Sequence, residues 1–202
     1  DEKNLWNGLP EPTNSAYGLS KRAVISYSYS LYKQYGFNCV NLLLSNLYGI
    51  NDDFRDETSH VIPALIKKMY FAKKDQKEEI IVWGDGSPTR DFLNTTDAAN
   101  SILRALQSDY NIPDPINIAS GQEISIKQLI KLIKKNINYE GKIKFDTSKP
   151  NGQPYRLLNI SKARELINFN PKINLEEGVK EVVSFFNQNK SEILKQKKKY
   201  SD

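Results

Sequence analysis

The chain has 202 residues, of which 39% are hydrophobic and 26% charged, a composition typical of globular proteins and unlike that of disordered or fibrous ones. Its formal net charge is +5, but residues 190–202 hold five lysines against two carboxylates, so the rest of the chain carries only +2 and offers no basic surface for nucleic acid. No stretch approaches the ~20 apolar residues of a membrane helix, and a single cysteine, Cys39, with a single histidine, His60, excludes an internal disulfide and a multi-histidine metal site.

The first expected elements are a helix and a buried strand. Residues 1–14 are polar and indicate a loop. Residues 16–35 contain no proline, Ser15 is a potential N-cap and Gly36 is a stop signal, which together predict a helix. Residues 37–44 are apolar at most positions, which favours a buried parallel strand. Helix, short turn and strand form the second half of a βαβ unit.

The rest of the pattern alternates strands with helices, which predicts an α/β fold. The long first helix needs a preceding strand, so we expect the later part of a Rossmann-type doubly wound parallel sheet. Thr95 or Thr96 is expected to cap one helix and Ser125 the next. The lysines within residues 195–199 indicate a solvated tail. The expected strands are 80–83, 90–93, 115–119 and 142–145, and the expected helices are 61–74, 95–108, 125–138, 161–167 and 175–189.

The first motif with chemical potential is Tyr17-Gly-Leu-Ser-Lys21. Positions i and i+4 share one face of a helix, so the phenol and the ammonium are neighbours. A nearby ammonium favours the phenolate form of a tyrosine, which suits proton exchange with a sugar or alcohol oxygen. On its own, this spacing equally describes a pair on a helix surface.

Two further motifs follow the first strand. Asn46 comes directly after it, where ligands bind in open α/β sheets. His60 lies beside Ser59 at the start of the next helix, and imidazole suits general acid–base work near neutral pH. Lys67 and Lys68, one to two turns later, are candidates for a phosphate contact. The structural alternatives are a plain turn, a packing histidine and a solvated helix face.

The fourth motif runs from Val82 to Leu93, with the sequence VWGDGSPTRDFL. Its Gly-x-Gly turn leads into a short strand that carries Arg90, and a guanidinium there is suited to clamp a diphosphate through two hydrogen bonds. It is not a dinucleotide-binding fingerprint, because a third glycine and a following helix are absent from the motif.

Taken together, these motifs resemble the extended short-chain dehydrogenase/reductase superfamily, and within it the GDP-L-fucose synthase family. The likeness runs from about residue 11 to residue 187. It is carried by Asn-Leu-Tyr-Gly at 46–49, Ser-His-Val-Ile-Pro-Ala-Leu at 59–65, the motif at 82–93 and Phe-Asp-Thr-Ser-Lys-Pro-Asn-Gly at 145–152. Tyr-x-x-x-Lys alone would indicate only the superfamily, whereas the histidine motif is specific to the family.

The resemblance implies a role for each matching residue. Tyr17 would be the acid–base at the sugar C4 oxygen, and Lys21 would assist it and hold the nicotinamide ribose. His60 would be the general acid of an epimerisation. Asn46 would lie at the sugar nucleotide and Arg90 at its phosphates. Further substrate contacts are implied for Lys67, Lys68, Trp83 and Lys149, and cofactor contacts for Tyr17, Lys21, Asn46 and His60.

The resemblance also implies an organisation and partners. Residues 1–48 and 94–120 would form the remaining part of a Rossmann-like domain, residues 49–93 and 121–190 a smaller α/β substrate domain, and residues 191–202 a basic tail. The cofactor would be NADP, with NAD as the alternative, and the substrate a GDP-sugar. The enzyme would be a cytoplasmic homodimer without nucleic-acid or membrane partners.

The sequence departs from the family pattern at several points. The family's Gly-rich dinucleotide loop, catalytic serine and epimerisation cysteine precede its tyrosine and are not found here, so we expect no turnover from these 202 residues alone. Cys39 does not match that cysteine, and Lys67 and Lys68 stand where the family has arginines. Two alternatives stay open: another GDP- or UDP-sugar enzyme (a 4-reductase, dehydratase or 4-epimerase), and a non-catalytic remnant or binding module.

Overall fold

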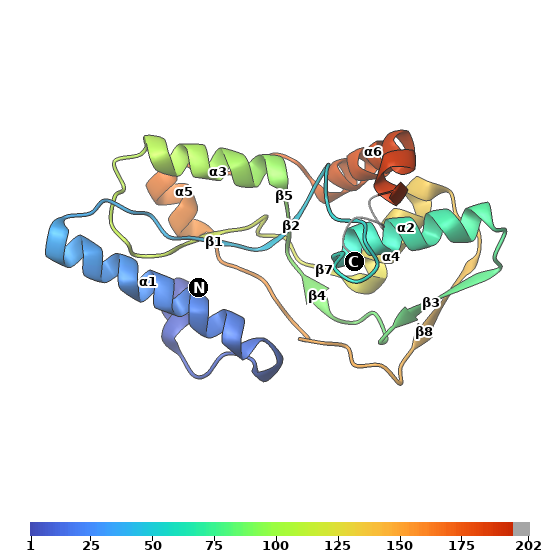
Figure 1. The fold of residues 1–202 in the computed structure, drawn as a ribbon, viewed down its shortest axis with the longest axis horizontal. Helices are drawn as coiled ribbons and strands as arrows, with labels where there is room; N and C mark the ends of the chain where they lie inside the picture. Colours follow the sequence, from blue (N-terminus) through green and yellow to red (C-terminus); the bar gives the residue numbers. More distant parts are fainter. Residues whose placement is uncertain (196–202) are drawn as a thin grey trace.

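The computed structural model describes residues 1–195, which form two groups of elements joined in the middle (Figure 1). The expected α/β fold is confirmed, since three strand pairs among the described residues are parallel. The helices are α1 (Ser15–Tyr35), α2 (Val61–Lys74), α3 (Thr95–Gln107), α4 (Ile126–Ile137), α5 (Ser161–Ile167) and α6 (Leu175–Lys195), with short 3-10 helices at Glu2–Trp6 and Pro12–Asn14. The strands are β1 (Leu42–Leu44), β2 (Asn46–Tyr48), β3 (Glu79–Trp83), β4 (Thr89–Arg90), β5 (Phe92–Asn94), β6 (Ile116–Ile118), β7 (Ile124–Ser125) and β8 (Lys142–Asp146).

The first expected strand changes its partner at Ser45. β1 pairs in parallel with β6, and the Ser45 N–H then donates to the Ile118 carbonyl at 2.9 Å. The chain next leaves β6 and continues as β2, which pairs in parallel with β5. Strand structure therefore begins later than the expected residue 37. The exchange carries Asn46 to the junction between the two groups (Figure 1).

The expected strand at 90–93 is likewise divided, because the side chain of Asp91 is fully buried. Its carboxylate accepts the Ser120 N–H at 2.9 Å, the Ser120 hydroxyl at 2.7 Å and the Gly121 N–H at 3.0 Å. Burial raises the pKa of this carboxyl group. On either side of Asp91, β4 pairs antiparallel with β7 and β5 pairs parallel with β2.

The helix ends follow capping chemistry. Gly36 adopts the left-handed conformation (φ 65°) that a stop signal requires, and its N–H donates to the Tyr32 carbonyl. Ser125 closes a capping box at the start of α4, as expected. The cap of α3 is Asn94 instead of a threonine, because its side chain accepts the Thr96 N–H at 2.8 Å.

The last helix is longer than expected. α6 continues past residue 189 to Lys195, since no helix breaker intervenes and Ile193 packs against the hydrophobic core. The rest of the expected basic tail, residues 196–202, lies outside the described residues. Neither α6 nor another helix within residues 1–195 is long and apolar enough to cross a membrane.

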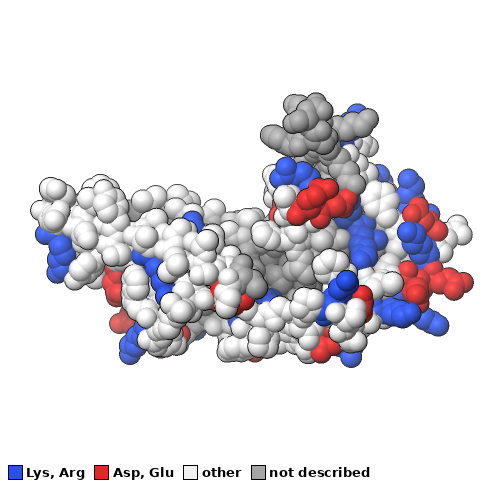
Figure 2. Space-filling model, turned by 60° about the horizontal axis from the view of Figure 1, so that its bottom comes forward, with Lys and Arg blue, Asp and Glu red and all other residues white. Residues whose placement is uncertain are grey.

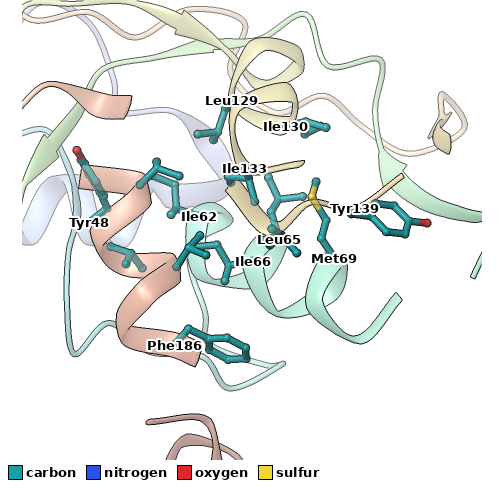
Figure 3. Close-up of a cluster of buried hydrophobic side chains, with 14 of the residues drawn as sticks. Tyr48, Ile62, Leu65, Ile66, Met69, Leu129, Ile130, Ile133, Tyr139 and Phe186 are labelled. Atoms are coloured by element: carbon teal, nitrogen blue, oxygen red, sulfur yellow. The ribbon is translucent and has the colours of Figure 1, made fainter. Parts of the chain in front are cut away.

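Each group of elements has its own hydrophobic core. The first core is formed mainly by α3, α5 and β6, with α1 lying alongside (Figure 1). The second core is formed by α2, α4 and α6, and Tyr48 extends into it from β2 (Figure 3). Residues 160–169 pack in the first core, although the expected boundary places them with residues 121–190. The apolar side chains of Ile160, Ala163 and Ile167 explain this placement, because helical spacing turns them toward one face.

A glycine on α6 makes room for Tyr48. A Cβ atom added at Gly178 would lie 2.1 Å from the Tyr48 hydroxyl and 2.8 Å from its ring, and the Tyr48 side chain is 2% exposed. We expect Gly178→Ala to lower the free energy of unfolding by about 1–3 kcal/mol, as overpacking of a core does, despite the better helix propensity of alanine. Urea unfolding measures this loss. Combining the change with Tyr48→Phe should recover part of it, and a Gly178→Ala chain as stable as wild type would contradict the packing.

Candidate active site

Two cavities meet at the junction of the two groups and share the side chains of Asn46, Leu47, Tyr48 and His60. One cavity, of about 560 Å³, extends toward α1 and is called the Tyr17 cavity; its other lining residues are Asn14, Tyr17, Leu44, Ser45, Gly49, Ile50, Asn51, Asp52, Asp53, Thr95 and Arg156. The other, of about 540 Å³, is called the Arg90 cavity; its other lining residues are Val61, Ile62, Pro63, Ala64, Leu65, Lys68, Val82, Trp83, Arg90, Phe92, Ile126 and Asn151.

Tyr17 lies in the first turn of α1, and its side chain is 58% exposed at the Tyr17 cavity. Lys21 follows one turn later, with its ammonium 5.3 Å from the centroid of the Tyr17 ring. The structure thus places the ammonium over the ring face and outside the residues that line the two cavities. The i and i+4 pairing is confirmed, while the role of Lys21 at the ribose stays a prediction.

His60 is the N-cap residue of α2, with an exposed side chain that makes no capping hydrogen bond. It lines both cavities, so it stands between Tyr17 on one side and Arg90 on the other. Asn46 also lines both cavities, and its amide donates to the Asp91 carbonyl at 3.0 Å. The structure therefore brings Tyr17, Asn46 and His60 together from three different elements.

Two sets of side-chain contacts stabilise the loop before His60. The Asp53 carboxylate accepts hydrogen bonds from the Arg55 guanidinium at 2.8 Å and from the Thr58 hydroxyl at 2.5 Å, and the Arg55 hydrogen bonds hold the pKa of Asp53 well below its usual range. The ammonium of Lys67 donates to the Phe54 carbonyl at 3.0 Å and pairs with Asp56 at 2.6 Å. These contacts fix the approach of the chain to α2.

Lys67 is thus directed at the loop and lines neither cavity, unlike the position that the expected phosphate contact would require. Its side chain is buried at 7% exposure and its ammonium is bound to the loop, whereas Lys68 lines the Arg90 cavity. Successive residues of a helix point about 100° apart, so one lysine turns inward and the next outward. The ammonium of Lys68 donates to the Ile81 carbonyl at the edge of the cavity.

The Arg90 cavity has the character of an anion site. Of the described residues that line it, none is Asp or Glu, whereas Lys68 and Arg90 are basic. The Arg90 guanidinium donates to the Thr89 and Gln153 carbonyls, both at 2.7 Å, which orient its plane. Partial burial, and then the positive charge of Arg156, lower the pKa of Arg90.

Arg156 is the site residue that the sequence analysis missed. Its guanidinium lies 3.4 Å from the Asn46 amide oxygen and lines the Tyr17 cavity, near enough to Arg90 for the two cations to repel. It follows the motif at 145–152 by four residues, and that short distance was the available signal. An anion between the two guanidiniums would offset their repulsion.

An aromatic plane completes the Arg90 cavity. Trp83 lies at the end of β3 with 69% of its side chain exposed, and the Lys149 ammonium stands 5.8 Å from its ring centroid. Asn151 fixes the neighbouring turn, since its amide oxygen accepts the Asp85 N–H at 2.8 Å. Lys149 is not one of the residues that line the Arg90 cavity, although its ammonium lies near Trp83, which does line it.

Comparisons of the chain with known proteins agree on one family. The sequence model described as "NAD dependent epimerase/dehydratase family" matches residues 2–119. The chain is 38% identical to "Probable GDP-L-fucose synthase 1" of Oryza sativa subsp. japonica over 93% of its own length and 57% of that protein. It thus spans little more than half of that relative.

Two solved structures extend the comparison. The GDP-L-fucose synthetase of Naegleria fowleri bound to NADP superposes with a TM-score of 0.85 at 31% identity, over 95% of this chain and 61% of that one. A GDP-mannoheptose C4 reductase of Campylobacter jejuni with NADP bound superposes with a TM-score of 0.82 at 26% identity, over 93% of this chain and 64% of that one. The resemblance detected in the sequence is confirmed.

Proposed function

The chain belongs to the NAD dependent epimerase/dehydratase family. We propose that its function is that of an NADP-dependent enzyme of the GDP-L-fucose synthase type. The reaction is epimerisation of a GDP-bound 4-keto-6-deoxy sugar at C3 and C5, followed by reduction at C4. The observation that carries this proposal is that Tyr17 and His60, which are distant in the sequence, line one cavity. A volume of about 560 Å³ is within the usual range of small-molecule sites.

The two cavities fit the two parts of a nucleotide sugar. The sugar would lie at the Tyr17 cavity, between the phenol and the imidazole. The diphosphate would lie between Arg90 and Arg156, whose like charges favour an anion between them. Trp83 offers an exposed ring beside this position. Asn46 belongs to both cavities and would mark the point where the sugar meets the phosphate.

The residues around Tyr17 suit the ribose of a nicotinamide cofactor. The phenol of Tyr17 is exposed, and the Ser45 hydroxyl at the same cavity is buried without a hydrogen-bond partner among the described residues. With Lys21, Asn46 and His60, they offer hydroxyl, ammonium, amide and imidazole groups to ribose oxygens. NADPH supplies the hydride when it is bound, and the NADP-bound neighbour supports this choice of cofactor.

The proton steps follow from the chemistry of the ketone. A C4 ketone makes the hydrogens at C3 and C5 acidic, and His60 would return a proton to the carbon on the opposite face after a base has removed one. Tyr17 would give its phenolic proton to the C4 oxygen as that carbon is reduced. Lys21, whose ammonium lies over the Tyr17 ring, would hold the nicotinamide ribose beside it.

Reduction at C4 without epimerisation is the second candidate, because a structural neighbour is a GDP-mannoheptose C4 reductase. Product stereochemistry separates the two reactions. We also propose a cytoplasmic homodimer. Exposed apolar residues on α1, among them Val24, Tyr27 and Tyr29, support a partner there, and most of the visible surface over the first core carries no charge (Figure 2).

The proposal is tested in a chimera in which this chain replaces the matched residues of the Naegleria fowleri protein. With GDP-4-keto-6-deoxymannose, we expect NADPH oxidation and a product inverted at C3 and C5. A reduced product with its original configuration would identify the second candidate. A folded chimera that binds NADPH but oxidises none with this substrate or with the corresponding UDP-sugar would contradict the proposal and favour a binding module.

A further inference from the structure

The loop between β2 and α2 brings acidic groups to the Tyr17 cavity beside His60. Asp52 and Asp53 are the two acidic residues among the described residues that line it. Both oxygens of Asp53 are occupied, since they accept hydrogen bonds from Arg55 and Thr58. Asp53 therefore stabilises the conformation of the loop. Asp52 is then the carboxylate that can accept a hydrogen bond from a group in the cavity.

One oxygen of Asp52 lacks a partner. Its Oδ1 accepts the Asp53 N–H at 2.8 Å, whereas its Oδ2 is shielded from solvent and has no hydrogen-bond partner among the described residues. A buried acceptor without a donor destabilises the folded chain. Burial raises the pKa of the Asp52 carboxyl group, and the nearby charge of His60 opposes that rise. A hydrogen-bond donor that reaches Oδ2 would thus stabilise the loop.

The side chain of His60 is the group suited to be this donor. Within residues 1–195 it makes no hydrogen bond, it is exposed, and it lines the same cavity as Asp52. The other ionisable groups that line the cavity are placed differently. The Arg156 guanidinium is directed at Asn46, the Tyr48 hydroxyl lies against Gly178, and Tyr17 lies at the α1 side of the cavity.

We propose that Asp52 is a positioning residue for His60. Oδ2 accepts the N–H of one ring nitrogen, which fixes the tautomer of the imidazole and leaves the second nitrogen toward the cavity. That second nitrogen binds a proton, delivers it to the sugar carbon and returns to the same tautomer. The hydrogen bond is inferred from the unpartnered Asp52 oxygen and the cavity that it shares with His60, while the proton delivery rests on the proposed function.

The single histidine of the chain makes the hydrogen bond directly measurable. Nitrogen-15 spectra of the imidazole, recorded at pH 9 on the 202-residue chain, report which ring nitrogen carries the proton. We expect one tautomer to dominate in wild type and Asp52→Asn to shift the populations toward those of a free imidazole. The matched control is Glu57→Gln, which removes an exposed carboxylate from the same loop outside both cavities and should leave the populations unchanged.

A wild-type chain whose tautomer populations already equal those of a free imidazole would overturn the proposal, and this holds even if the Asp52→Asn chain fails to fold. Unchanged populations in a folded Asp52→Asn chain would overturn it as well.

Kinetics of the chimera separate this proposal from the proposed function. Asp52→Asn should lower kcat for the inverted product about 10- to 100-fold, as loss of an orienting partner does, and leave KM nearly unchanged because Arg90 and Arg156 hold the phosphates. A rise in KM with unchanged kcat would contradict a positioning role, because it would show that Asp52 contributes to substrate binding instead. Absence of all turnover in the unsubstituted chimera would contradict the proposed function, while the tautomer measurement would still decide on Asp52.

Discussion

Replacing Tyr17 by phenylalanine is expected to lower kcat for ketone reduction about 10²- to 10⁴-fold in the chimera, the range that general acid–base catalysis contributes. The phenylalanine ring keeps the packing over which the Lys21 ammonium lies, 5.3 Å from the ring centroid, and removes only the hydroxyl. The hydroxyl is the group that would protonate the C4 oxygen, so KM for the nucleotide sugar should change little. Steady-state oxidation of NADPH measures both constants.

A matched control lies on the same helix. Tyr35 is 74% exposed at the end of α1 and does not line either cavity, so Tyr35→Phe removes an equivalent hydroxyl away from the site. It should leave kcat within about twofold of the unsubstituted chimera, because surface substitutions rarely alter the folded structure. Equal losses in the two variants would show that the effect of Tyr17→Phe is not catalytic.

The second large effect is expected at Asp91, where replacement by alanine should lower the free energy of unfolding by about 2–5 kcal/mol, because several buried donors lose their acceptor. The carboxylate is fully buried and accepts three hydrogen bonds from Ser120 and Gly121, so its removal leaves these donors without partners. The Asp91 main chain also accepts from Asn46 and follows Arg90 directly. Both cavities should therefore lose their shape with the fold.

Chemical denaturation of the 202-residue chain measures the loss at Asp91. Asp91→Asn keeps the shape of the side chain but presents an NH₂ group to one of the backbone donors, so its loss should be smaller than that of the alanine variant and still measurable. The comparison carboxylate is Asp114, an exposed residue that pairs with Lys162; surface pairs contribute about 0–1 kcal/mol. Equal stability of Asp91→Ala and Asp114→Ala would contradict this account.

The elements that the sequence predicted correctly are those with repeated local signals. α1 is bounded by Gly36, α2 carries its proline in the first turn, and α4 begins with the Ser125 capping box, and each boundary depends on neighbours in the sequence. The cap of α3 was missed because Asn94, Thr95 and Thr96 are all suitable cap residues in a row. Only the tertiary position of β5 selects Asn94.

The strand errors have a different cause. Ser45 and Asp91 both interrupt stretches that read as single strands, because each stretch pairs with two different partners. The change of partner strand depends on contacts between segments distant in the sequence, such as that of Asp91 with Ser120. The pattern of neighbouring residues does not predict such contacts.

The candidate site shows the same division. Tyr17, Asn46, His60 and Arg90 could be chosen because residue type and motif coincide, and the structure places each of them at one or both of the two cavities. Lys67 was chosen for its charge and its position after His60, but its ammonium is bound to the loop and lines neither cavity. Arg156 was missed because it lies in an irregular segment with no motif of its own, and only the folded chain brings it to Asn46.

The central claim is that Tyr17 and His60 act on one sugar in one cavity, with separate proton steps. The stereochemistry of the product made by a His60→Gln chimera tests it most directly. We predict that NADPH oxidation continues and that the reduced sugar keeps its original configuration at C3 and C5, because the acid that inverts those carbons is gone. Formation of the inverted sugar at an unchanged rate would contradict the account.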